Sequence, residues 1–105
     1  MTPSDRTLPA WLEVLGDEDL RFLRRFLEAS GSLKALAGEY GVSYPTVRAR
    51  LDRLIAKVRA AEEPNVTDPF DRKVRVLVAD GQLSAPLAKE LLDAHRAARP
   101  EAKGT

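Results

Sequence analysis

Five basic side chains gather in one short segment of this sequence, residues 44–61. They are Arg48, Arg50, Arg53, Lys57 and Arg59, and a single acid, Asp52, leaves the segment with a net charge of +4. The flanking segments are weakly acidic: residues 1–43 hold five basic and seven acidic side chains, and residues 62–105 hold seven and eight. Because the whole chain is only +1, this local surplus is typical of a surface that binds phosphate groups. A well-solvated amphipathic helix is the alternative interpretation.

Composition restricts the class of protein. With 105 residues, 44% of them hydrophobic, the chain has the size of one small soluble domain. It has no cysteine and a single histidine, so we expect no disulfide, no metal or cofactor site and no catalytic triad. His95 is predicted to be a solvated helix residue. No apolar run approaches the ~20 residues of a membrane span, and the N-terminus lacks the regions of a signal peptide, so we expect a cytoplasmic protein that is not an enzyme.

Apolar residues recur at helical spacing through the first half of the chain, residues 8–61. A short helix is predicted within residues 9–16. Asp17 is the predicted N-cap of a second helix, which Gly31 follows. The buried face of this second helix is predicted to consist of Leu20, Leu23 and Leu27, broadened by Phe22 and Phe26.

Residues 32–61 have the pattern of a helix-turn-helix. Ser32 and Ser43 are predicted N-caps, and the second of the two helices is expected to span about residues 44–61. Each remaining position has a backbone or packing reason: a small Ala37 where the helices cross, Gly41 for a left-handed turn, Val42 between the helices, and Val47 and Leu51 in their interface. No β-wing is expected, because the following residues lack strand periodicity.

The C-terminal part reads as a linker, residues 62–68, and a helical hairpin, residues 69–98. Asp68 and Ser84 are its predicted N-caps. Residues 74–78, V-R-V-L-V, also alternate like a strand ahead of an Asp-Gly turn, so a helix and a strand both stay open for Val74–Ala79. Residues 1–7 are expected to be flexible and residues 99–105 disordered.

The helix that begins at Tyr44 is the candidate to enter a DNA major groove. Its inward stripe leaves a set of outward residues as base-reading candidates: Tyr44, Pro45, Thr46, Arg48, Ala49, Asp52 and Arg53. The phosphate candidates are Ser32, Lys34, Ser43, Arg50, Lys57 and Arg59. Arg48 can bond guanine through its guanidinium fork. Asp52 either accepts from a cytosine amino group or pairs with Arg48 or Lys57 at helical spacing.

The stretch from "LPAWLEVLGDEDLRFL" through "SGSLKALAGEYGVSYPTVRARLDRLI" resembles a small bacterial family of domains of unknown function, family 2089. The resemblance is close over residues 8–58 and looser through "VRVLVADGQLSAPLAKELL". It implies a helix-turn-helix with a regulatory role, and it favours helices for the C-terminal hairpin. Longer relatives carry a cysteine zinc ribbon, so the resemblance is to a short form without that ribbon, and no metal site carries over to this cysteine-free chain.

The sequence therefore predicts an all-α protein, with a tri-helical helix-turn-helix domain and a short C-terminal helical hairpin. The predicted function is a sequence-specific transcriptional regulator that binds double-stranded DNA as a homodimer. The hairpin could serve as the dimerisation element, because two short helices cannot bury all of its apolar residues. The alternative is a protein–protein interaction module that uses the same fold without binding DNA.

Overall fold

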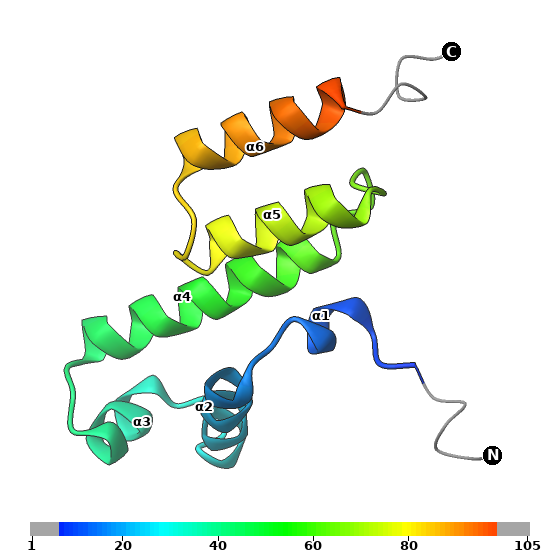
Figure 1. The fold of residues 1–105 in the computed structure, drawn as a ribbon. Helices are drawn as coiled ribbons and strands as arrows, with labels where there is room; N and C mark the ends of the chain where they lie inside the picture. The colour runs from blue at the N-terminus through cyan, green and yellow to red at the C-terminus, as the bar shows by residue number, and fades with distance from the viewer. Residues whose placement is uncertain (1–6, 99–105) are drawn as a thin grey trace.

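The computed structural model describes residues 7–98, and within that range it contains helices and no strand (Figure 1). The helices are α1 (Ala10–Glu13), α2 (Asp17–Glu28), α3 (Leu33–Tyr40), α4 (Tyr44–Ala61), α5 (Pro69–Ala79) and α6 (Ala85–Ala97). The all-α prediction is confirmed, and Val74–Ala79 is helix. The segments expected to be flexible or disordered lie outside the described residues, apart from residue 7.

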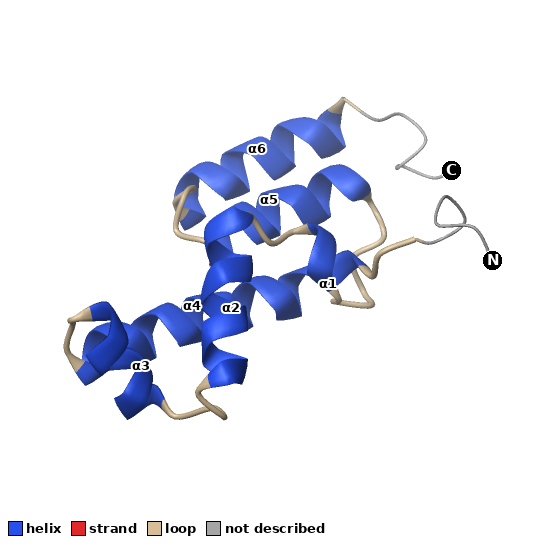
Figure 2. Ribbon diagram, turned by 90° about the horizontal axis from the view of Figure 1, so that it is seen from below, coloured by secondary structure: helices blue, strands red, loops and turns tan. Residues whose placement is uncertain are grey.

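The long helix α4 is the centre of the fold. Helices α1 and α3 pack against it on one side, and α5 runs antiparallel along its other side, with α6 stacked antiparallel on α5 (Figure 1). Figure 2 shows α2 crossing α4 at a steep angle. The core between the first four helices is made by Leu15, Phe22, Leu33, Leu36, Ala37, Val47 and Leu54.

Four of the predicted N-caps are confirmed. The Ser32 and Ser43 hydroxyls accept from the backbone N–H groups of residues 35 and 46, at 3.1 and 3.3 Å. The Asp68 carboxylate accepts from the N–H of residue 70 at 3.1 Å, and the Ser84 hydroxyl from that of residue 87 at 3.2 Å. Each cap satisfies one of the orphan donors of a helix N-terminus. The starts of α3, α4, α5 and α6 are therefore encoded locally.

The prediction for α2 was wrong in two respects. Its N-cap is Gly16, whose N–H donates to the Asp19 carboxylate at 3.1 Å, and Asp17 is the first helical residue. The buried face is centred on Phe22, whereas Leu20 and Leu27 are 42% and 66% exposed. Five apolar residues spread over nearly half of this helix's circumference, so periodicity alone did not fix which of them face the core.

The turn between α3 and α4 has the predicted left-handed glycine. Gly41 has φ 66° and ψ 35°, and the N–H of Val42 bonds back to the carbonyl of Ala37 at 3.1 Å, which closes the end of α3. Val42 itself is 43% exposed, so the prediction that it fills the angle between the helices was wrong. Leu36 and Ala37 fill that space from α3.

Two glycines of this region allow a matched test of the turn. Gly41→Ala should lower the free energy of unfolding by about 1 kcal/mol, because an L residue is strained at positive φ. Gly38→Ala, inside α3 with no atom close to the added methyl, should raise it by about 0.5–1 kcal/mol. Urea unfolding of both variants measures the difference, and equal effects of the two would contradict the turn geometry.

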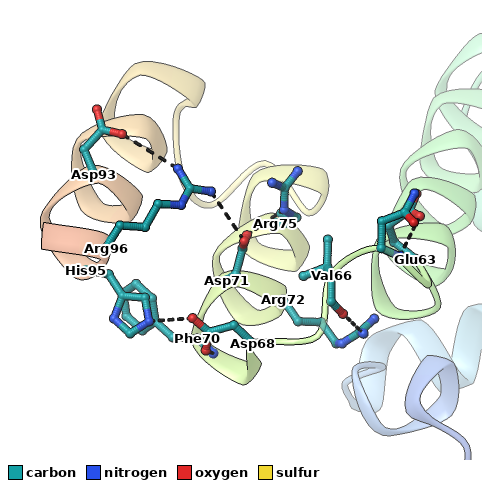
Figure 3. Close-up of polar contacts among 11 residues, drawn as sticks. Glu63, Val66, Asp68, Phe70, Asp71, Arg72, Arg75, Asp93, His95 and Arg96 are labelled. Atoms are coloured by element: carbon teal, nitrogen blue, oxygen red, sulfur yellow. Dashed lines mark hydrogen bonds and ion pairs between the residues drawn. The ribbon is translucent and has the colours of Figure 1, made fainter. Parts of the chain in front are cut away.

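The loop of residues 62–68 fastens α5 to α4. Val66 is buried, and the Arg72 guanidinium donates to the backbone carbonyl of Val66 (Figure 3) and to that of Ala61. Helix α5 consequently packs directly along α4, and the loop that joins them is held in place. The C-terminal hairpin thus continues the helical layer of the first domain.

His95 is not the solvated residue that we predicted. Its Nε2 lies 2.6 Å from Oδ2 of Asp68, and its ring packs against that of Phe70 at a centroid distance of 4.3 Å (Figure 3). Its partners lie 25 or more residues away, at the start of α5, and so could not be read from the local pattern. The contact joins the C-terminal end of α6 to the N-terminus of α5.

Candidate nucleic-acid interface

Helix α4 presents one continuous exposed face. Val47 and Leu54 point into the core, and Leu51 and Val58 lie partly buried beside them. The opposite face exposes all seven base-reading candidates, which are Tyr44, Pro45, Thr46, Arg48, Ala49, Asp52 and Arg53. The structure therefore brings these seven side chains together on the first turns of the second helix of a helix-turn-helix.

Asp52 pairs with Arg48 on this face. Its Oδ1 lies 3.2 Å from Nε of Arg48, and both side chains are more than half exposed. An exposed pair of this kind contributes little stability and opens readily, so Arg48 remains available to a partner. Of the interpretations left open for Asp52, the structure favours pairing with Arg48.

The phosphate candidates divide into two groups. Ser32, Lys34, Ser43 and Arg59 are exposed, although both serine hydroxyls also cap their helices, and the Ser43 hydroxyl contacts that of Thr46 at 2.8 Å. These four side chains are open to solvent, with Arg59 on α4 and the other three at the N-terminal ends of α3 and α4.

Arg50 and Lys57 form the second group and face the interior of the fold. The Arg50 guanidinium lies over the Phe22 ring, 5.2 Å from its centroid, and 4.0 Å from the Asp19 carboxylate. Lys57 is 6% exposed; its ammonium bonds to Asp19 and lies 3.3 Å from Asp80. We therefore remove Lys57 as a phosphate contact, because its ammonium is enclosed by two carboxylates. Arg50 is half-buried by the same cluster.

The Asp19, Lys57 and Asp80 side chains, called here the α2–α4–α5 ion cluster, shift two pKa values. Burial alone would raise the pKa of Asp19, but hydrogen bonds from Lys57 and the Gly16 N–H, together with the charges of Lys57 and Arg50, leave it lowered. Burial alone would lower the pKa of Lys57, but Asp19 and Asp80 leave it raised. In both cases the ion pair outweighs the cost of burial.

These shifts predict how the cluster responds to pH. The Asp19 contribution to stability is complete above its ordinary pKa of 3.8 and is lost as pH falls through the lowered folded value. The Lys57 contribution is complete below its ordinary pKa of 10.5 and is lost as pH rises through the raised folded value. Urea unfolding of Asp19→Asn across pH should show a flatter loss of stability in acid than the unaltered chain, whereas Asp17→Asn, an exposed neighbour, should keep the original slope. An unchanged acid slope in Asp19→Asn would contradict the cluster.

Sequence reasoning did not find this cluster, because its partners lie on α2, on α4 and at the C-cap of α5. Asp19 and Lys57 are 38 residues apart. One signal was available: Lys57 lies three residues after Leu54 and one before Val58, on the edge of the apolar stripe, where a side chain meets the neighbouring helices.

Comparison with known families finds a match, which lies within residues 15–61. A family model described as Domain of unknown function (DUF2089)-HTH matches residues 15–61. Residues 15–61 are thus similar to the helix-turn-helix domain of this family. This match covers α2, α3 and α4, the helices that carry the exposed face, and it confirms the resemblance seen in the sequence. No curated protein and no solved structure matches the chain.

Beyond residue 61, α5 and α6 lie outside the DUF2089 match. Among residues 7–98, no group of three or more acidic or histidine side chains is placed to hold a metal ion. No described helix combines the length and the apolar character needed to cross a membrane.

Proposed function

We propose that the protein is a sequence-specific transcriptional regulator that binds double-stranded DNA as a dimer, with the N-terminal half of α4 in the major groove. The observation that carries this proposal is the exposed face of α4, where Arg48 and Arg53 lie with Thr46 and Ala49 on the second helix of a helix-turn-helix. Arginine bidentate to guanine is the commonest specific contact in that groove. A single helix reads only a few base pairs, so specificity requires two copies.

The electrostatics support phosphate contacts around this helix. With Lys57 and much of Arg50 held by Asp19, the exposed cations of the segment are Arg48, Arg53 and Arg59, joined by Lys34 at the start of α3. These few cations imply a modest number of counterions released for each copy. The salt dependence of one copy should therefore be modest, and a second copy should steepen it and raise the affinity.

One observation favours a protein partner instead. Two of the five cations of α4 are engaged inside the fold, and a third pairs with Asp52 on the outer face, which weakens the positive potential there. Exposed leucines on α2 add apolar surface to the same domain. On this second reading the same fold presents α4 or α2 to another protein, without nucleic acid.

Binding of the full chain to mixed duplex fragments at two salt concentrations separates the two functions. A DNA-binding protein should lose affinity by on the order of tenfold or more between 50 and 200 mM salt, because it releases counterions from several phosphates. The measurement is fluorescence anisotropy of labelled DNA. Absence of binding at low salt, with the helical circular-dichroism spectrum intact, would overturn the DNA proposal and favour the protein partner.

A further inference from the structure

Helix α6 carries an apolar seam that the other helices of the described part, residues 7–98, leave exposed. Leu87 and Leu91 are 46% and 39% exposed, and Ala94 and Ala98 on the same side of the helix are also exposed. These four residues, called here the α6 seam, follow one another at intervals of four, three and four. That spacing is the seam of a helix that packs lengthwise against another helix.

The rotation of α6 about its axis is fixed by contacts on its other sides. Ala88 is buried against α5, His95 bonds to Asp68, and Arg96 lies 3.6 Å from Asp71 (Figure 3). These contacts hold the C-terminal turns of α6 on the N-terminal half of α5. The α6 seam is therefore exposed in the hairpin as it is packed, and binding there needs no rearrangement of α6 on α5.

Most charged side chains of α6 lie away from the seam and are paired with one another or with α5. Lys89 and Asp93 pair with each other at 2.9 Å, and Arg96 pairs with Asp71 and Asp93. By helical position, all three lie on the side of α6 away from the seam. The seam itself consists of leucine and alanine, and of the charged residues of α6 only the exposed Glu90 lies beside it, so its recognition rests mainly on shape.

We propose that the α6 seam binds a second copy of this chain, with the two α6 helices antiparallel. The seam is large at its N-terminal end, where Leu87 and Leu91 lie, and small at its C-terminal end. Antiparallel pairing places Leu87 opposite Ala98 of the second copy and Leu91 opposite its Ala94, so each leucine meets an alanine. Parallel pairing would set leucine against leucine and alanine against alanine, which crowds one end and leaves a void at the other.

This pairing specifies the interface of the dimer in the proposed function, and its biological role rests on that function. The surface itself can be tested without DNA. The seam covers about three turns of helix, so we expect a weak dimer, with dissociation in the micromolar range, of the class formed by small interfaces. Each copy of the dimer would supply one α4 to a two-fold symmetric DNA site.

Analytical ultracentrifugation of the full chain tests the surface. The unaltered chain should approach twice its 11.6 kDa at about 100 µM, and the double variant Leu87→Lys with Leu91→Lys should sediment at 11.6 kDa. The control is Leu20→Lys with Leu27→Lys, two leucines of α2 that are equally exposed or more so, which should leave the dimer intact. A monomeric unaltered chain, or a dimer broken by the α2 variant alone, would overturn the proposal.

Single cysteine substitutions test whether the two α6 helices pair antiparallel or parallel. This test does not require that the lysine variants fold. The chain has no cysteine, so each introduced thiol is unique. On oxidation, a mixture of Leu87→Cys and Ala98→Cys proteins should form the mixed disulfide. Ala98→Cys alone should not crosslink, since its two copies would lie ~16 Å apart along the antiparallel helices.

Efficient crosslinking of Ala98→Cys alone would show a parallel pair, and no crosslink in either case would remove the seam as an interface. Anisotropy of labelled DNA with the α6 double variant then separates the two proposals. Retained salt-dependent binding by a monomer would leave DNA binding standing while the seam fails, whereas a dimer that binds no DNA would leave the seam standing alone.

Discussion

Lys57→Met should lower the free energy of unfolding by about 3–5 kcal/mol, the largest effect that we expect from a single substitution. The methionine side chain fills a similar volume, so the loss measures charge and not packing. Asp19 and Asp80, whose side chains are 15% and 16% exposed, would face each other without the ammonium that now lies between them. Removal of one partner from a buried ion group leaves the others uncompensated, which costs much more than the group as a whole contributes.

Arg59→Met is the matched control for this prediction. Arg59 lies two residues further along α4 and is exposed, so its replacement should change stability by less than about 0.5 kcal/mol. Chemical denaturation of both variants gives the comparison. If Lys57→Met were as stable as the unaltered chain and instead lost DNA affinity, Lys57 would be a phosphate contact and the ion cluster would have no structural role.

Replacement of both Arg48 and Arg53 by alanine should weaken DNA binding on the order of 100-fold, because each arginine contact to a base or phosphate contributes about 1–3 kcal/mol. The two side chains flank the exposed face of α4, on either side of Ala49. Loss of both should also reduce the steepness of the salt dependence, since fewer counterions are released. Fluorescence anisotropy at low salt measures the affinity.

Arg24→Ala is a control for the loss of Arg48, the arginine of the exposed pair on α4. Arg24 forms an i, i+4 pair with Glu28 at 3.2 Å, the same geometry and distance as the pair of Arg48 with Asp52. It lies on α2, away from the face of α4, so its loss should leave DNA affinity within about twofold. An equal loss in Arg24→Ala and in the α4 variant would show that only general charge is sensed.

Local signals in the sequence predicted the helix-turn-helix well. Ser43 marks the start of α4, because its hydroxyl caps the backbone N–H three residues later. Gly41 marks the turn, because its φ is positive. Both signals depend on neighbours within a few residues, and the family match over residues 15–61 agrees with them. Most of the candidate site follows from these boundaries, since Val47 and Leu54 fix which side of α4 is exposed.

The contacts between helices were not predictable in the same way. Leu20 and Leu27 have the spacing of a buried face, and only the packing of Phe22 beside Tyr40 and α4 shows that they are outside. Lys57 is a residue type that commonly contacts phosphate. Only its contacts with Asp19 and Asp80 show that its ammonium is buried within the fold. In each case a residue from a distant helix decides between two roles that the local pattern allows equally.

Amide NMR of the full chain during titration with a mixed DNA duplex tests the DNA-binding face most directly. Binding through α4 predicts that the signals of residues 44–53 shift or broaden first, together with those at the start of α3, while the signals of α6 stay in place. Raising the salt concentration should reverse these changes. Absence of any shift at low salt, or shifts confined to α5 and α6, would contradict DNA binding through α4.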